Sequence, residues 1–140
     1  TKNIVELAGA VPKPFDGLEL HGEVAEIEQS MARMFDDIVP ALEESDLARA
    51  RGIMGSHTII ASKVDEHVRA LFAGEALSGR SGHAVTVALY LRYLKRVSAH
   101  LKNVATSVVN PYHRIGYREK GSRAKAKGAP RRKGSPGKKK

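Results

Sequence analysis

The chain has 140 residues, of which 41% are apolar and 5% aromatic, and it carries a net charge of +9 with no Cys. This length suits one compact domain with attached tails, and the apolar content is sufficient for a folded core. The lack of Cys excludes disulfides and thiolate metal sites. No segment approaches the ~20 apolar residues that a membrane-crossing helix needs.

The charge is distributed unevenly along the chain. Residues 118–140 contain eleven Lys and Arg against one acid, so this tail is +10, whereas residues 1–117 sum to −1. Within that body, residues 1–46 sum to −8 and residues 47–117 sum to +7. We therefore expect the two halves of the body to attract each other if they pack side by side.

Residues 1–19 are predicted to be a leader. Pro12, Pro14 and Gly17 punctuate this segment, and the residue before a proline is disfavoured in a helix. We find no basic segment followed by a cleavage site, so we expect no signal peptide. Because the first residue is Thr1 rather than Met, the chain is either processed or a fragment of a longer protein.

From Leu20 onward an apolar residue recurs every three or four positions, which predicts a helix with one apolar face. Pro40 falls inside this pattern and lacks an amide hydrogen, so it either ends the helix near Val39 or kinks it. We expect a kink, because Leu42 continues the pattern. The apolar face consists of Leu20, Val24, Ile27, Met31, Met34, Ile38 and Ala41.

The same spacing predicts two further helices, over about residues 47–72 and 83–109. Asp46 or the serine before it can cap the first of these helices, and Gly74 suits its C-terminal end. The apolar faces consist of Ala50, Ile53, Met54, His57, Ile60, Ala61, Val64, Val68 and Leu71, and of Val87, Tyr90, Leu91, Leu94, Val97, Ser98, Leu101, Val104, Ala105 and Val108.

Helices joined by short loops pack antiparallel, so we predict an all-α, up-down-up three-helix bundle over residues 20–117. Residues 118–140 contain no large apolar residue. We predict that they form a disordered basic tail, because such a segment cannot offset its ordering entropy. Three helices bury less apolar surface than four, so we also expect a homo-dimer.

Two segments resemble the PhoU family of phosphate-transport regulators. Residues 92–105 read RYLKRVSAHLKNVA, which is similar to the family motif R-x-L-E-R-I-G-D-H-x-x-N-I-A. Residues 64–71 read VDEHVRAL, which is similar to V-D-E-L-Y-R-E-L. The resemblance implies one PhoU-like repeat, where the family typically has two, and it extends to the PhoU-like cytoplasmic end of bacterial sodium–phosphate symporters. The motif positions are Asp65, Arg92, Lys95, Arg96 and Asn103.

In PhoU proteins, carboxylates on these helices bind clusters of iron or zinc, and acids at helical spacing are suited to such hard cations. Here Lys95 and Ala99 stand where the motif has acids, and Ala61 and Ser62 stand where acids usually precede Asp65. Asp65 is the only retained family acid. We therefore expect no metal site of the family type and no cofactor.

Two interpretations of Lys95 remain open. Lys95 can replace the charge of the metal by pairing with Asp65, or both residues are solvated surface charges worth under about 1 kcal/mol as a pair. The basic face of the third helix can bind phosphate, an acidic partner or lipid headgroups, but we favour its pairing with the acidic first helix or a second copy. The candidate residues for binding an anion or a partner are Arg92, Arg96, Lys102, Arg131, Arg132 and Lys133.

The sequence does not indicate a catalytic centre, and we predict that the protein is not an enzyme. It has no Cys nucleophile, no serine elbow, no H-E-x-x-H motif and no phosphate-binding loop that contains Lys. His57 lies on an apolar face and is expected to be a core or boundary residue rather than a metal ligand. Asn103 is expected to form a structural hydrogen bond between helices.

The sequence leaves two functions open. The first is a PhoU-like regulatory domain in phosphate transport or phosphate homeostasis, which acts by protein contact in the cytoplasm. If the chain is part of a sodium–phosphate symporter, it lies at the inner face of the membrane. The alternative is a small protein that binds nucleic acid non-specifically through its basic tail and dimerises through the bundle. The tail also suits an anionic membrane surface.

Overall fold

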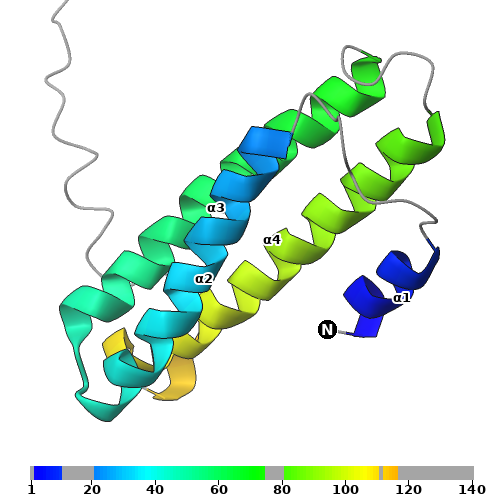
Figure 1. Cartoon of the computed structure of the whole chain (residues 1–140). Coiled ribbons are helices and arrows are strands. Elements are labelled where there is room, and N and C mark those ends of the chain that lie inside the picture. Colours follow the sequence, from blue (N-terminus) through cyan, green and yellow to red (C-terminus); the bar gives the residue numbers. More distant parts are fainter. Residues whose placement is uncertain (1, 11–20, 75–80, 111, 117–140) are drawn as a thin grey trace, which may run out of the picture.

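The computed structural model describes residues 2–10, 21–74, 81–110 and 112–116, and within these residues every regular element is a helix. The helices α2, α3 and α4 lie side by side, and α3 runs antiparallel to both neighbours (Figure 1). The predicted all-α class is therefore confirmed. The elements are α1 (Lys2–Ala10), α2 (His21–Glu43), α3 (Leu47–Ala73), α4 (Ser81–Val109) and the short 3-10 helix η1 (Tyr112–Arg114).

The core lies between α2, α3 and α4 and is formed by the apolar faces that the sequence predicts. Its apolar side chains are Ile, Leu, Val, Met and Ala, and among the described residues no aromatic side chain is fully buried. Ser98 and Thr106 are polar residues that are fully buried among them. The buried apolar residues are Ile27, Met31, Met34, Ile38, Ala41, Ala50, Ile53, Ile60, Val64, Leu71, Val87, Leu91, Leu94, Leu101 and Ala105.

Helix α3 begins and ends where its capping residues predict. Asp46 precedes its first turn, and the Asp46 carboxylate accepts hydrogen bonds of 2.9 Å from the backbone N–H groups of Ala48 and Arg49. These bonds satisfy amides that have no partner inside the helix. Gly74 follows the last turn in the left-handed conformation, with φ = +73°, which glycine adopts without steric cost.

Helix α2 continues through Pro40 to Glu43, so it does not end at Val39. Because Pro40 has no amide hydrogen, the carbonyl of Asp36 lacks the helical donor that would come from position 40. The last turn is closed instead by the N–H of Asp46, which donates to the Ala41 carbonyl over 3.0 Å.

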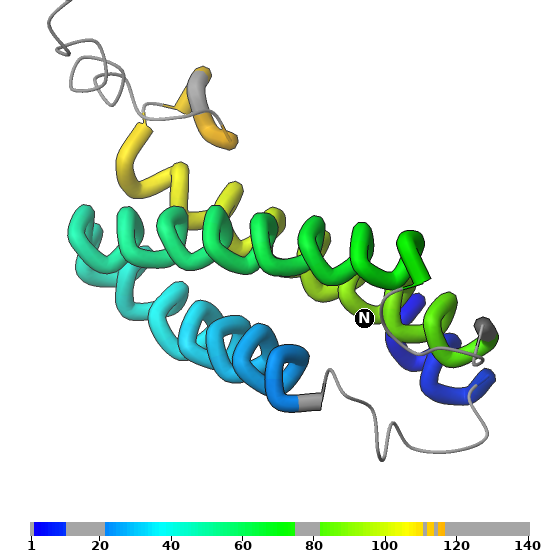
Figure 2. The backbone as a smooth tube through the Cα atoms, turned by 90° about the horizontal axis from the view of Figure 1, so that it is seen from above, coloured from blue at the N-terminus to red at the C-terminus, as the bar shows by residue number. Residues whose placement is uncertain are grey.

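A fourth helix, α1, corrects the predicted leader and the predicted number of helices. The prolines at 12 and 14 follow Ala10, so they limit where a helix can end but do not prevent one before them. Ile4 and Leu7 are the half-buried residues of α1, which packs against α4 and not against α2 (Figures 1 and 2). Residues 11–19 of the leader and the tail at 118–140 lie outside the described residues.

None of the described helices is both long enough and apolar enough to cross a bilayer.

Candidate functional site

The two motif segments meet between α3 and α4 through Asp65 and Lys95. Lys95 Nζ lies 2.6 Å from both Asp65 Oδ1 and Asp65 Oδ2. This hydrogen bond lowers the pKa of Asp65 against the opposing effect of partial burial, and the nearby charge of Arg92 acts in the same direction. The side chains of Lys95 and Asp65 are 27% and 46% exposed. The ion pair is therefore formed, as the first interpretation of Lys95 predicts, but water screens it.

The other motif positions lie on the outer side of α4. Arg92, Arg96 and Asn103 are exposed, and among the described residues Arg92 and Arg96 have no ion-pair partner. The predicted inter-helix hydrogen bond from the Asn103 side chain is not formed within the described part of the chain. The backbone carbonyl of Asn103 accepts a hydrogen bond of 2.6 Å from the Thr106 hydroxyl within α4.

Lys102 is tied to the segment that follows α4 rather than to a neighbouring helix. Lys102 Nζ donates to the Gly116 carbonyl over 3.1 Å, and the N–H of Gly116 donates to the buried hydroxyl of Thr106. Gly116 adopts φ = +87° there. Lys102 thus fastens the end of the bundle, which is a structural role that its place in the basic motif does not reveal.

A polar pair inside the core joins α3 to α4 and was missed by the sequence analysis. His57 Nδ1 lies 2.9 Å from Ser98 Oγ, and the Ser98 hydroxyl donates to the Lys95 carbonyl over 2.8 Å. Because the Ser98 hydrogen is used in this way, the Ser98 oxygen accepts from Nδ1–H of His57. Burial, together with the positive charges of Lys102 and Lys95, lowers the pKa of His57.

This pair is structural and does not have the geometry of a nucleophilic dyad. A catalytic base must accept the serine proton, whereas His57 donates to Ser98. Ser98 is also fully buried, so no substrate reaches its hydroxyl. A usable signal existed in the sequence, because two polar residues stood on the apolar faces of adjacent helices.

The acidic helix α2 pairs mainly with α3 and not with the basic face of α4. Lys63 Nζ lies 2.6 Å from Glu26, and this contact lowers the pKa of the Glu26 carboxyl. His67 Nδ1 lies 3.1 Å from Glu23. The contact with α4 is a hydrogen bond of 2.5 Å from the Tyr90 hydroxyl to Glu28. The attraction between the two halves of the body therefore exists. Within the described residues the arginines of α4 do not pair with α2 of the same chain, and their pairing with a second copy stays a prediction.

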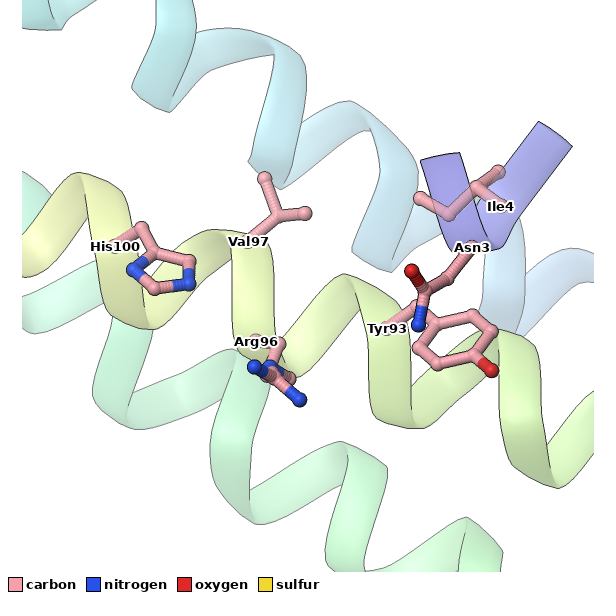
Figure 3. Close-up of a pocket in the computed structure, with 6 residues that line it drawn as sticks. All are labelled: Asn3, Ile4, Tyr93, Arg96, Val97 and His100. Carbon is pink, nitrogen blue, oxygen red and sulfur yellow. The ribbon is translucent and has the colours of Figure 1, made fainter. Parts of the chain in front are cut away.

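An open cleft of about 180 Å³ lies where α1 meets α4. Figure 3 shows Asn3 and Ile4 of α1 near Tyr93 of α4, with Arg96, Val97 and His100 further along α4. The Arg96 guanidinium and the exposed His100 imidazole stand at spacing i, i+4, and no carboxylate contributes to the lining. This cleft includes one of the predicted anion-binding residues, Arg96. The lining residues are Asn3, Ile4, Tyr93, Arg96, Val97 and His100.

The remaining predicted binding residues belong to the basic tail. Arg131, Arg132 and Lys133 lie outside the described residues. Within the part of the chain that the structure describes, no three His, Asp or Glu side chains converge on a point where a metal ion would fit. Asp65 is instead engaged by an ammonium group.

The chain was compared with protein families, curated proteins and solved structures, and no relative was found. No family model, no curated protein and no solved structure matches the chain.

Proposed function

We propose that the chain is a regulatory interaction module: one PhoU-like helical repeat that acts in phosphate transport or phosphate homeostasis by protein contact rather than by catalysis. The observation that carries this proposal is the 2.6 Å contact between Lys95 and both carboxylate oxygens of Asp65. In the family that the chain resembles, this part of the bundle is where carboxylates bind metal. Here a positive side chain neutralises the retained acid, so the pair holds α3 to α4.

The polar groups inside the bundle support the same conclusion. His57 and Ser98 are engaged with each other and with the backbone, which suits packing and not chemistry. What distinguishes this bundle is its outer surface: an acidic α2, and on α4, beside the α1–α4 cleft, arginines that pair with no carboxylate of the described residues. Because these charged groups lie on the surface, we expect the module to act by binding a partner there. We place this action in the cytoplasm, or at the inner face of the membrane if the chain belongs to a symporter.

The phosphate assignment is tested in the host cell. Deletion of the corresponding gene is expected to change the uptake of radiolabelled phosphate when external phosphate is limiting, and the intact gene should restore it. As a control, uptake of an unrelated solute should not change. Normal phosphate uptake and normal growth across a range of phosphate concentrations would overturn the phosphate assignment.

The charge of the tail supports a second candidate, which is non-specific binding to nucleic acid. Eleven Lys and Arg within residues 118–140 would release counterions from a phosphate backbone, so affinity should fall steeply with salt. Removal of residues 118–140 is expected to abolish DNA and RNA binding measured by gel shift. If the shortened chain loses nucleic-acid binding and also no longer complements the gene deletion, the second candidate is favoured over the first.

A further inference from the structure

Helix α2 carries a second line of apolar residues that the bundle does not bury. Phe35, Val39 and Leu42 are 51%, 53% and 41% exposed. They follow one another at steps of four and three, so they share one face of the helix. The core line of α2 runs alongside through Met34 and Ile38, which are buried. Three large apolar side chains in line, over ~10 Å of helix, form a surface rather than isolated exposed residues.

The hydrogen bond between Glu28 and Tyr90 shows which way this line faces. Glu28, Phe35 and Leu42 are spaced by seven residues and therefore lie on the same side of α2. Because Glu28 accepts a hydrogen bond from Tyr90, that side of α2 is turned toward α4. The apolar line is thus continuous with α4 rather than opposite to it.

Helix α4 carries apolar residues at the same spacing of seven. Val97 and Val104 follow Tyr90 by seven and fourteen residues, and α2 and α4 run in the same direction (Figure 1). Starting from the contact between Glu28 and Tyr90, Phe35 is therefore level with Val97, and Leu42 is level with Val104. Val97 is half-buried and Val104 is 43% exposed. We call this surface the α2–α4 strip, and it consists of Phe35, Val39, Leu42, Val97 and Val104.

Two unneutralised acids border the strip on α2. Asp36 and Glu43 are exposed and spaced by seven residues, so they form one rim beside Val39. Within the described residues neither has an ion-pair partner. Of the other acids of α2, Glu26 and Asp37 form ion pairs with Lys63 and Arg49, Glu23 contacts His67, and Glu28 accepts a hydrogen bond from the Tyr90 hydroxyl.

The acidic rim discriminates between possible occupants of the strip. A second copy that packed its α2 antiparallel on this α2 would bring Asp36 of one copy close to Glu43 of the other, and like charges at an interface are unfavourable. The tail of the chain has suitable charge but no large apolar residue, so it cannot cover the apolar line. An amphipathic helix with Lys or Arg along one flank fits both the apolar line and the acidic rim: its apolar face covers the line, and its basic flank meets the rim.

We propose that the α2–α4 strip binds an amphipathic helix of a partner protein, with apolar residues on Phe35, Val39 and Leu42 and basic residues along the rim of Asp36 and Glu43. This inference rests on the proposed function as a contact module and specifies where the contact occurs. It follows the general mode in which an apolar helix face with i, i+3/i+4, i+7 anchors packs on a complementary surface. Apolar contact supplies the affinity, and the acidic rim selects the charge of the partner.

The test uses the full chain and a synthetic helical peptide of about 18 residues, long enough to form several turns. The peptide places Leu at steps of three and four, Lys along one flank and Ala elsewhere, and it carries a fluorescein label. A matched peptide has Glu in place of Lys. Binding is followed by fluorescence anisotropy, and all protein variants keep the basic tail, so any effect of the tail is common to them.

The Lys peptide is expected to lose about tenfold in affinity with Phe35→Ser, as for removal of a central anchor. The double variant Asp36→Asn, Glu43→Gln should weaken it several-fold. Ile59→Ser is the matched control, since Ile59 is 62% exposed on α3, outside the strip, and it should bind like the unaltered chain. Circular dichroism checks that each variant keeps its helical content.

Equal affinity of the Phe35→Ser and unaltered chains for the Lys peptide would overturn the proposal. So would a dimer, seen by light scattering, that Phe35→Ser converts to a monomer, because a second copy would then cover the strip. Failure of the phosphate assignment is separate from this test: peptide binding with normal phosphate uptake would retain the docking site and remove the cellular role.

Discussion

Neutralising Lys95 tests whether the pair at the motif positions stabilises the bundle. Lys95→Met keeps most of the side-chain length but removes the charge from Asp65. Two unit charges about 4 Å apart in water attract by about 1 kcal/mol, and exposed pairs measured by mutation contribute about 0.2–1 kcal/mol. The side chains of Lys95 and Asp65 are 27% and 46% exposed, but Lys95 contacts both carboxylate oxygens directly. We therefore expect the pair to contribute about 0.5–1 kcal/mol to the free energy of unfolding.

A double-mutant cycle isolates this energy. The four proteins are the unaltered chain, Lys95→Met, Asp65→Asn and the double variant, each unfolded in urea at pH 7 and low salt and followed by circular dichroism. Asp65 has its pKa lowered in the fold, so its contribution is present above the ordinary carboxyl value of about 4. It is lost as the pH falls through the lowered value. The coupling should therefore vanish in strong acid and weaken in high salt.

Glu66 provides the matched control, because it is an exposed acid next to Asp65 with no ion pair among the described residues. A cycle of Lys95→Met with Glu66→Gln should give a coupling close to zero. If the cycle with Asp65 also gives zero at pH 7 and low salt, or gives a coupling that persists in strong acid, the argument for a stabilising pair fails.

Three further substitutions test the core, the half-buried His57 and the helix cap by urea unfolding. Leu91→Ala should lower the free energy of unfolding by about 2–5 kcal/mol, because it leaves a cavity at a fully buried position. Leu89→Ala, at a position that is 40% exposed, should lower it far less. Similar losses for the two variants would contradict the packing described for Leu91. The lowered pKa of His57 means that the unfolded chain binds a proton more readily, so stability should fall as the pH drops below about 6.5. His57→Gln should flatten that fall, and an unchanged pH profile would show that other groups cause it. Asp46→Ala should cost about 1 kcal/mol by removing the cap of α3, a loss that Asp46→Asn should largely avoid.

The sequence was sufficient to predict the three long helices and their core because both depend on local spacing. An apolar residue at every third or fourth position can be buried only on a helix, and Asp46 and Gly74 mark the ends of α3 through chemistry that acts within one turn. Helix α1 was missed for a related reason. Pro12 and Pro14 were taken to disfavour helix throughout the leader, although a proline restricts only the residues around it.

The candidate site was harder to predict because it depends on the register between helices. The pairing of Lys95 with Asp65 was one of two interpretations that the sequence left open, and it depended on a base that stands where the resembled motif has an acid. No such rule linked His57 to Ser98, because each residue alone resembles a tolerated polar side chain on an apolar face. The α2–α4 strip was missed because the helical period was assigned to one apolar face, and Phe35, Val39 and Leu42 belong to a second.

The hydrogen bonds and ion pairs between the helices also indicate which helix separates from the bundle most readily. Within the described residues, the inter-helix polar contacts in which neither partner is exposed, Lys95 with Asp65 and Ser98 with His57, join α3 to α4. Those that hold α2 end on exposed carboxylates such as Glu26. Local opening follows the contacts that a segment loses, so we expect α2 to open more readily than the α3–α4 hairpin. Hydrogen exchange would then be faster in α2, which is the helix that contributes Phe35 to the strip.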